Sequence, residues 1–476
     1  MRKIGRQVNF IGTSEINPRN GEGSFIRRSD GSIVFAYTEF VGDDWEDDAV
    51  ARISATVSYD EGENWGEKHV LFNKPDEAKN IMSFSFLRMN NGDIGAFYII
   101  KNADETDQIV FCRSADEGKS WSSAKNCLDC LDEQDYYVIN NDRVIKLPGG
   151  RILFAAARHT VLTEHKEFMP GVICFFVSDD DGETFRKIET EFSCPFPKNP
   201  DGYEEPGLYV LPDGKIWCYI RTSLGFQFES FSTDNGESWS VPEPNIAISS
   251  ACSPMLVKDC GKYTVAVFNP EPEHLMRDEN EPWGRTPYVI AISSDRGRTF
   301  EKHNVFYLED DRNNGYCYPA ITETKDGFLV AYYHSNSTGI CLNSTKVIKI
   351  TFDELEYAMR KSLVESYQGK TVRIVMDRPL GYVHKKENYT LVYPINYGCI
   401  PDVIGGDGEE LDVYLLGVDE AVDEYTAKII GIVHRRNDVE DKLVAAPEGM
   451  NFTKEEIEAA VRFQEQYYDS EVEVAE

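Results

Sequence analysis

The chain has 476 residues and a formal net charge of −33 at pH 7, and 41% of its residues are hydrophobic. This charge argues against binding to nucleic acid or to an anionic membrane, because phosphates and lipid headgroups would repel the protein. The length exceeds what one ordinary core supports, so we expect one large domain followed by a second.

The start of the chain, MRKIGRQVNFIGTSE, has basic residues but no apolar segment, so we expect no signal peptide. No apolar run reaches the roughly 18 residues of a membrane span. Among eleven cysteines only Cys127 and Cys130 form a close pair, which is a weak signal for zinc or redox chemistry. Reduced, buried thiols are the simpler interpretation, and they favour a cytoplasmic protein.

Five copies of the motif Ser-x-Asp-x-Gly-x-x-aromatic run through residues 58–300. They begin at Ser58, Ser114, Ser178, Ser232 and Ser293. Asp and Ser bond backbone N–H groups in a tight turn, Gly supplies a positive φ, and the aromatic ring fills the gap between sheets. A motif that recurs at this interval predicts radial repetition of small sheets.

A second repeat consists of turn dipeptides between apolar runs. Its six copies are Asp30-Gly31, Asn91-Gly92, Gly149-Gly150, Asp213-Gly214, Cys260-Gly261 and Asp326-Gly327. Most feed a β-rich strand, as in SDGSIVFAY and KDGFLVAYY, and the first five each precede a copy of the Ser-Asp-Gly motif. The two repeats predict a mainly β fold, a six-bladed β-propeller over residues 1–362 whose last blade is closed by the N-terminal strand. An open β-sandwich with glycine turns is the alternative.

The pattern changes after the sixth hairpin. Residues 342–362 predict a strand followed by a helix, and a new β-rich pattern begins near Gly369. In FTKEEIEAAVRFQEQYY, Thr453 and Glu456 stand in a capping-box frame before apolar residues at helical spacing, which predicts a C-terminal helix. We expect the acidic tail DSEVEVAE to fray. The second domain is placed at residues 363–476.

Charged residues on the inner strands and loops of a propeller would line one end of its channel, whereas the repeated Asp residues would lie on the outer rim. The acid-rich loop GDDWEDDAVARIS offers Asp43, Asp44, Asp47 and Asp48. Crowding would raise the pKa of such carboxyls, although a solvated acidic surface is the alternative.

Two further stretches have the polar residues expected of channel-facing loops that bind substrate hydroxyls. They are YYVINNDRVIKL, with Asn140, Asn141, Asp142 and Arg143, and FAAARHTVL, with Arg158 and His159. A lone histidine such as His159 is more often structural than catalytic.

These repeats, together with the segments EEPGLYVLPDGKIWCYIR and GYCYPAITETKDG, resemble the sialidase (neuraminidase) superfamily over residues 1–355. The resemblance implies Tyr318 as the nucleophile and Glu205 as its base, with Tyr316 as the alternative nucleophile. It also implies an Asp as acid/base: Asp47 or Asp48, with Asp43 and Asp44 as rivals.

The same resemblance implies three arginines that clamp a carboxylate: Arg19, Arg221 and Arg285. Arg19 stands in NPRNGEGSFIRRSDG, which departs from the family's usual F/Y-R-I-P sequence, and Arg27 is its alternative. A guanidinium matches a carboxylate in bidentate geometry, so an arginine cluster indicates an anionic ligand. For each arginine, a structural salt bridge is the simpler explanation.

The implied activity is that of an exo-α-sialidase-like retaining glycosidase, without a cofactor, acting on a terminal sialic acid or a related acidic sugar. Such a sugar has its carboxylate at the anomeric carbon and would repel a carboxylate nucleophile, which explains the use of a neutral phenol. The alternative is a non-catalytic carbohydrate-binding propeller. In either case the expected partner is a carbohydrate that carries a carboxylate.

Residues 369–468 resemble the soluble family I inorganic pyrophosphatases in a short form, through YPINYGCIPDVIGGDGEELDVYLLG and IVHRRNDVEDKLVAAPEG. The resemblance implies a small β-barrel with Mg²⁺ ligands at Asp407, Glu409, Asp412 and Asp438, with Glu440 or Asp441 also in the later segment. Glu409 replaces an Asp of the family signature D-x-D-P-x-D. Phosphate contacts are implied for Tyr397, Lys442 and Arg378.

The early Glu and Lys of the pyrophosphatase site have no counterparts before Arg378. This domain is therefore either a Mg²⁺-dependent pyrophosphate hydrolase or a degenerate module for ligand binding or assembly.

Overall fold

The computed structural model describes the chain except for residues 103–105, 133–134, 163–166, 197–198, 252, 272–284, 336–341, 387–388 and 476. Its contacts divide it into two compact units, residues 3–354 and 355–476. The predicted boundary at residue 362 falls inside helix α1 (Phe352–Glu365).

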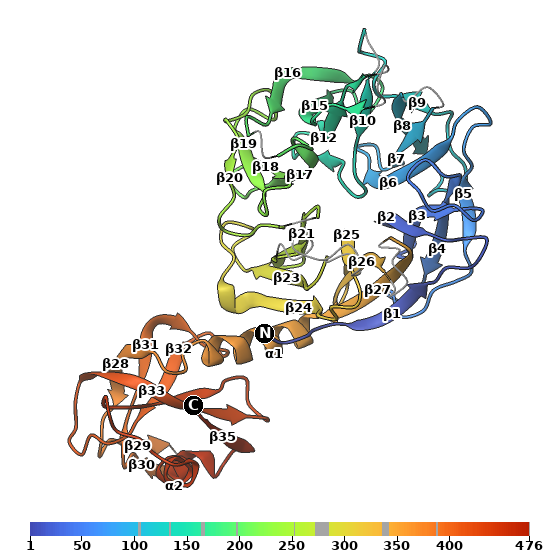
Figure 1. Cartoon of the computed structure of the whole chain (residues 1–476). Coiled ribbons are helices and arrows are strands. Elements are labelled where there is room, and N and C mark those ends of the chain that lie inside the picture. Colours follow the sequence, from blue (N-terminus) through green and yellow to red (C-terminus); the bar gives the residue numbers. More distant parts are fainter. Residues whose placement is uncertain are drawn as a thin grey trace. The chain divides into compact units, whose positions relative to one another are not determined.

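Residues 3–354 form six antiparallel sheets around a common centre (Figure 1). The first two sheets contain β2 (Asn20–Arg27), β3 (Ile33–Phe40), β4 (Ala51–Ser58) and β5 (His69–Phe72), then β6 (Asn80–Arg88), β7 (Ile94–Lys101), β8 (Asp107–Ser114) and β9 (Lys125–Asn126). The third contains β10 (Tyr136–Val138), β11 (Ile145–Lys146), β12 (Ile152–His159), β15 (Val172–Ser178) and β16 (Arg186–Ser193), and β13 (Val161–Leu162) pairs with β14 (Glu167–Phe168) beside it.

The remaining three sheets repeat the same order from the centre outward. The fourth and fifth are β17 (Glu204–Val210), β18 (Ile216–Arg221), β19 (Phe228–Ser232) and β20 (Glu243–Pro244), then β21 (Leu256–Cys260), β22 (Tyr263–Phe268), β23 (Tyr288–Ser293) and β24 (Val305–Glu309), with a 3₁₀ turn, η2 (Lys302–Asn304), before β24. The sixth is β25 (Tyr316–Thr324), β26 (Gly327–His334), β27 (Ser344–Thr351) and β1 (Arg6–Ile11).

The first and last strands of the propeller belong to one sheet. Strand β1 pairs antiparallel with β27, so the N-terminal strand supplies the outermost strand of the sixth blade. This pairing confirms the predicted six-bladed architecture and the predicted mode of closure.

The core lies between neighbouring blades. One apolar cluster joins Val34 and Ala36 of the first blade to Phe84 and Phe86 of the second, and comparable clusters fill the next three interfaces. Each blade buries both faces in this way, which explains why its strands read as nearly continuous apolar runs.

Each Ser-x-Asp-x-Gly motif closes the turn between the third and fourth strands of its blade. In the first copy, the Gly62 amide donates to Ser58 Oγ at 2.9 Å and the Asn64 amide donates to Asp60 Oδ1 at 2.9 Å. Trp65 then packs in a cluster that also contains Leu329 of the sixth blade. The repeated acids therefore hold the turns, and the aromatic residue of each motif seals one blade against the next.

The innermost strands share an irregularity at the same place. Pairing with the second strand shifts between Gly21 and Ser24 in β2, and equivalent shifts occur in β6, β17 and β25. Inside these bulges lie non-glycine residues with positive φ: Glu22 (52°), Ser83 (59°), Glu205 (44°) and Tyr318 (54°). Bulges of this kind redirect a side chain, here toward the centre of the propeller.

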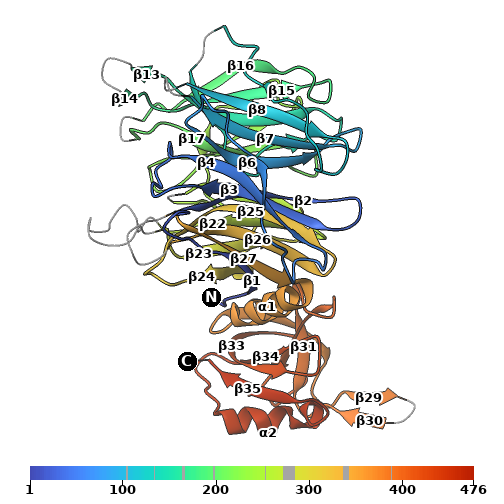
Figure 2. The same ribbon diagram turned by 90° about the vertical axis from the view of Figure 1, so that its right-hand side faces the viewer.

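Residues 355–476 form a ring-like sheet with two helices. Strands β28 (Thr371–Arg378), β31 (Asn396–Ile404), β32 (Glu410–Leu415), β34 (Lys442–Ala446) and β33 (Glu424–Arg435) pair in that order, and β28 also pairs with β33. The hairpin of β29 (Val383–Lys386) and β30 (Tyr389–Val392) projects from this unit (Figure 2). The predicted small β-barrel is confirmed.

The C-terminal helix α2 (Lys454–Glu465) begins with the predicted capping box of Thr453 and Glu456. The expectation of a frayed tail is wrong, because β35 (Ser470–Val474) pairs antiparallel with β33. Its single buried side chain, Val472, packs in the cluster beneath α2.

All nine cysteines in the described ranges are free thiols, including Cys127 and Cys130. None of the helices in these ranges is long and apolar enough to cross a membrane.

We predict that Gly62→Ala destabilises the propeller more than Gly31→Ala does. Both glycines have positive φ, 84° and 89°, so either alanine is strained by about 1 kcal/mol. An added Cβ at Gly62 would also lie 2.6 Å from Leu329 Cδ1, whereas nothing lies within 4 Å at Gly31. This overlap adds about 1–3 kcal/mol. Denaturant unfolding measures the difference, and equal midpoints would contradict the close seal between blades.

Candidate active site

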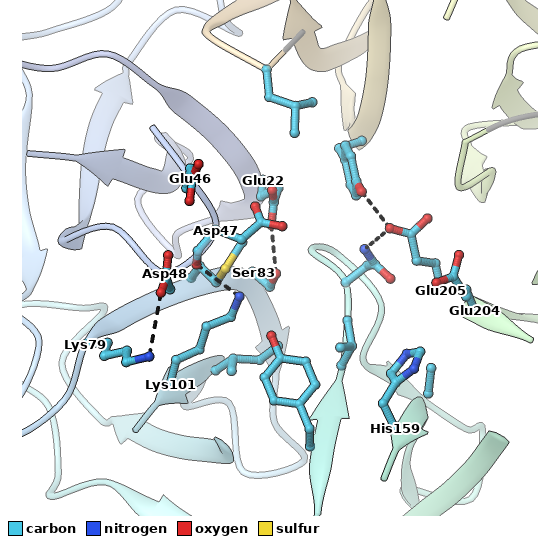
Figure 3. A pocket seen from close by; sticks show the side chains of 18 of the residues that line it. Glu22, Glu46, Asp47, Asp48, Lys79, Ser83, Lys101, His159, Glu204 and Glu205 are labelled. Carbon is cyan, nitrogen blue, oxygen red and sulfur yellow. Dashed lines mark hydrogen bonds and ion pairs between the residues drawn. The ribbon is translucent and has the colours of Figure 1, made fainter. Parts of the chain in front are cut away.

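A cavity of about 680 Å³ opens at the end of the propeller where the innermost strands begin (Figure 3). Its wall is polar and charged, with side chains from all six blades, the fifth contributing Arg285 just before β23. The charged residues and Tyr318 in this wall are Glu22, Glu46, Asp47, Asp48, Lys79, Lys101, His159, Glu204, Glu205, Arg221, Arg285 and Tyr318.

A phenol and a carboxylate meet inside this cavity. The Tyr318 hydroxyl donates to Glu205 Oε1 at 2.6 Å, and Asn140 Nδ2 donates to the same oxygen at 3.3 Å. Arg221 Nη1 donates to Glu205 Oε2 at 2.5 Å. Strands β17, β18 and β25 thus bring together three residues that the sequence marked for the site.

Glu205 and Tyr318 are held in place by strained backbone conformations that the surrounding packing maintains. Glu205 and Tyr318 both have positive φ, at 44° and 54°, in the bulges of two different blades. A non-glycine residue in this region costs about 1–3 kcal/mol and persists only where its surroundings over-determine it. Such strain clusters at functional sites because it fixes side chains before a ligand arrives.

Burial and charge separate the two groups as proton acceptor and proton donor. Burial, reinforced by Glu205, raises the pKa of Tyr318 well above its usual value, so the phenol is neutral. Burial also raises the pKa of Glu205, but Arg221 and the Tyr318 hydroxyl outweigh it, and the net shift is downward. Glu205 is therefore a carboxylate, ready to accept the phenol proton.

The three predicted arginines differ in their surroundings. Arg221 and Arg285 line the cavity, and the Arg285 guanidinium lies 5.4 Å from the Tyr318 ring centroid. Arg19 is 1% exposed, and its nitrogens donate to Tyr333, Glu22 and Asp47. Arg19 therefore does not line the cavity itself but pairs with Glu22 and Asp47, which do.

The alternative to Arg19 lies elsewhere. Arg27 donates to the Gly31 carbonyl and pairs with Glu61 at 2.7 Å, beside the turn at the opposite end of its blade.

The acidic loop places two of its four candidates at the cavity. Asp47 and Asp48 line it, whereas Asp43 and Asp44 are exposed outside it. The expected rise in pKa through crowding is wrong for Asp47. Burial alone would raise the pKa of Asp47. Arg19, 2.6 Å away, and Lys101 lower this pKa by more than burial raises it, so the net shift is downward.

The segment 140–143 mostly holds blades together. Asp142 accepts hydrogen bonds from Ser24 Oγ at 2.8 Å and from Lys258 Nζ at 2.7 Å. Asn141 Nδ2 donates to the carbonyls of Gly23 and Pro319, and the buried Arg143 guanidinium lies 5.5 Å from the Tyr219 ring.

The other polar candidates divide in the same way. His159 lines the cavity, with Nδ1 3.1 Å from the Met169 carbonyl, and burial lowers its pKa. Arg158 instead pairs with Asp135 and Glu191, both at 3.2 Å. The alternative nucleophile, Tyr316, is 1% exposed and packs edge-on against His334.

Sequence reasoning missed several residues of the cavity wall. Glu22 and Ser83 occupy the bulges of the first two blades, and Ser83 Oγ donates to Glu22 Oε2 at 2.8 Å. Lys101, at the end of β7, donates to the Asp47 carbonyl at 3.0 Å. The other polar residues of the wall that were missed are Glu46, Lys79, Asn102, Thr106, Tyr136 and Glu204.

A spacing in the sequence could have found two of these residues. Glu22, Ser83, Glu205 and Tyr318 each stand nine residues before the turn glycine of their hairpin, namely Gly31, Gly92, Gly214 and Gly327. In the fifth blade the corresponding position is residue 252, which lies outside the described residues.

Residues 31–331 match the profile of a family described as BNR repeat-like domain. The chain belongs to this family. Residues 362–470 match the inorganic pyrophosphatase family. No curated protein sequence matches the chain significantly.

Solved structures with similar folds cover 72–74% of this chain. An intramolecular trans-sialidase from Ruminococcus gnavus has a TM-score of 0.56 and 14% identity, over 73% of this chain and 97% of that one. A mutant of the NanB sialidase from Streptococcus pneumoniae has a TM-score of 0.55 and 14% identity, over 74% of this chain and 71% of that one. A protein of unknown function from Dyadobacter fermentans has a TM-score of 0.54 and 17% identity, over 72% and 99%. Identities this low establish the fold alone.

The pyrophosphatase domain has its own cluster of charged groups. The Tyr397 hydroxyl donates to Asp412 Oδ2 at 2.5 Å, and Lys442 Nζ lies between the carboxylates of Asp412 and Glu440. The Arg378 guanidinium lies 5.1 Å from the Tyr397 ring. The three predicted phosphate-side residues are thus brought together.

The predicted Mg²⁺ ligands are not brought together. Asp438 pairs with Arg435 at 2.7 Å, Asp407 accepts from the Glu409 amide, and Asp412 pairs with Lys442. Across the described ranges, no three His, Cys, Asp or Glu side chains form a group that could hold a metal ion. The Lys442 ammonium already lies between the Asp412 and Glu440 carboxylates, where a divalent cation would have to bind, so these residues do not fit Mg²⁺ in this arrangement.

We predict that Asp142→Asn destabilises the BNR repeat-like domain by about 1–3 kcal/mol, because an amide NH₂ replaces one carboxylate oxygen and leaves a buried donor without its acceptor. The Asp142 side chain is 3% exposed and accepts from Lys258, Ser24 and the Ile321 amide. Thermal unfolding measures the loss, with Asp43→Asn on the exposed loop as the control. A variant as stable as the control would show that this carboxylate does not hold the blades.

Proposed function

We propose that the BNR repeat-like domain is a retaining exo-glycosidase that releases a terminal sialic acid or a related acidic sugar. The observation that carries the proposal is the hydrogen bond of 2.6 Å from Tyr318 to Glu205 inside a cavity that also contains Arg221 and Arg285. The sialidase and trans-sialidase folds among the structural neighbours support it.

The proposed reaction begins with proton transfer from the Tyr318 hydroxyl to Glu205. The phenolate oxygen attacks the anomeric carbon, the bond to the leaving oxygen breaks, and that oxygen takes a proton from an acid in the loop of residues 43–48. Water then attacks the same carbon, gives a proton to the same acid, and releases Tyr318, which recovers its proton from Glu205.

The two cavity arginines would hold the sugar carboxylate during these steps, since a guanidinium binds a carboxylate through two parallel hydrogen bonds. Asp47 is our candidate for the acid, with Asp48 as its rival. Because Arg19 holds Asp47 ionised in the free protein, this role requires that the ion pair loosens once a substrate fills the cavity.

We predict that Tyr318→Phe lowers kcat for a fluorogenic α-sialoside at least about a thousandfold, because the covalent step has no nucleophile. Tyr316→Phe is the matched control, since its ring is buried outside the cavity, and it should retain activity. Equal turnover by the wild type and Tyr318→Phe would refute the mechanism. Saturable sugar binding without turnover in any variant would instead favour a carbohydrate-binding propeller.

The family match at residues 362–470 raises pyrophosphate hydrolysis by the C-terminal domain as a second activity, but the charge cluster of this domain argues against it. Because Lys442 occupies the space between Asp412 and Glu440, we predict no Mg²⁺-dependent release of phosphate from pyrophosphate by the full chain. A phosphate-release assay with and without Mg²⁺ tests this. Release that is lost in Asp412→Asn would overturn the prediction and make the domain an active hydrolase.

A cytoplasmic location stays a prediction from the sequence. Together with the proposed activity, it would suit the trimming of imported oligosaccharides.

A further inference from the structure

We infer that Glu204 couples the binding of an anionic sugar to proton uptake: when a substrate carboxylate enters the cavity, Glu204 takes up a proton and ceases to compete for Arg221. This inference rests on the proposed function, because it concerns the same carboxylate subsite.

Two consecutive glutamates face one arginine. Glu204 and Glu205 stand at the start of β17 and both line the cavity (Figure 3). Successive side chains of a regular strand point to opposite faces. The register shift after Glu204 and the positive φ of Glu205 break that alternation. Arg221 Nη1 consequently lies 2.5 Å from Glu205 and 3.8 Å from Glu204.

The local charges balance only while no ligand is bound. Arg221 and Arg285 on this side of the cavity oppose the two glutamates, so the group is neutral when both carboxyls are ionised. A substrate carboxylate adds a third negative charge in a poorly solvated site. Carboxylates that share one site disfavour one another's ionised form, and protonation of one of them restores neutrality.

Glu204 is the group that can accept this proton. Glu205 is held in its ionised form by hydrogen bonds from Tyr318, Asn140 and Arg221. The only ion pair of Glu204 among the described residues is the longer one to Arg221, and its side chain is 22% exposed, so a proton can reach it.

The ionisation of Glu204 responds to every charged group around it. Burial raises its pKa most, Arg221 lowers it, Glu205 and Asp201 raise it again, and Arg285 lowers it, with a net rise to about 7. His159 and Asp47 also line the cavity, but both have lowered pKa values. Neither His159 nor Asp47 therefore gains a proton readily above pH 7.

These facts set the direction of the pH dependence. Below about pH 7, Glu204 is already protonated in the free protein, so binding takes up little proton. Above pH 7 Glu204 is ionised in the free protein, and the binding of each anion is accompanied by the uptake of close to one proton. Affinity for the anion then falls by up to about tenfold per pH unit.

The test is calorimetric titration of the full chain with the 2,3-unsaturated analogue of sialic acid, at pH 6 and pH 8, in two buffers of different ionisation enthalpy. The buffer dependence of the heat gives the number of protons taken up. We expect uptake near zero at pH 6 and close to one at pH 8. Glu204→Gln should abolish this difference and bind the analogue about tenfold more tightly than the wild type at pH 8. Asp201→Asn, which removes another carboxylate near Glu204, should keep the wild-type uptake.

The gain in affinity separates this role from a structural one, because a damaged site would bind more weakly. Binding by the wild type without uptake at pH 8, or uptake that survives Glu204→Gln, would overturn the inference while the proposed function stands. No binding of the analogue at any pH would refute the proposed function, and the inference with it.

Discussion

One backbone irregularity, repeated around the ring, gives this propeller its chemistry. A regular inner strand would alternate its side chains between the two neighbouring blade interfaces, and the centre would contain few functional groups. The bulges in β2, β6, β17 and β25 instead aim a glutamate, a serine, a second glutamate and a tyrosine inward. The apolar seals between blades supply the energy that keeps these strained residues in place.

The same constraint explains why so much charge is buried without loss of the fold. Two of the inward-facing acids have a partner from a different blade: Asp142 has Lys258, and Glu205 has Tyr318 from across the centre as well as Arg221 of its own blade. Unpaired charges would be expensive in this setting, whereas pairs that span blades also fix the angle between sheets. Catalytic and structural ion pairs therefore use the same residue types on the same strands, and only their exposure to the cavity distinguishes them.

This similarity between catalytic and structural ion pairs limits what could be predicted from the sequence alone. The two repeats predicted the six sheets and the closing strand, and a single short motif predicted the capping box. Such motifs can be found in the sequence because they dictate turns and caps directly. Asp142 and Arg143 were expected at the site, since adjacent polar residues on a loop look alike whether they bind a substrate or another blade. Lys101 and Tyr136 could not be found, because each ends or begins a strand whose neighbours come from elsewhere in the chain. The tail at residues 470–474 was misjudged because its charged residues alternate with valines that only a partner strand can bury.

The pairing of β1 with β27 has a consequence for how the chain is made. Residues 6–11 leave the ribosome early, yet their partner, residues 344–351, follows only after five other blades have been synthesised. Until then β1 has no strand to pair with and the first blade has no neighbour on one side, so apolar surface stays open throughout most of translation. Closure is thus a late, non-local step, of the kind that slows folding and exposes a nascent protein to chaperones.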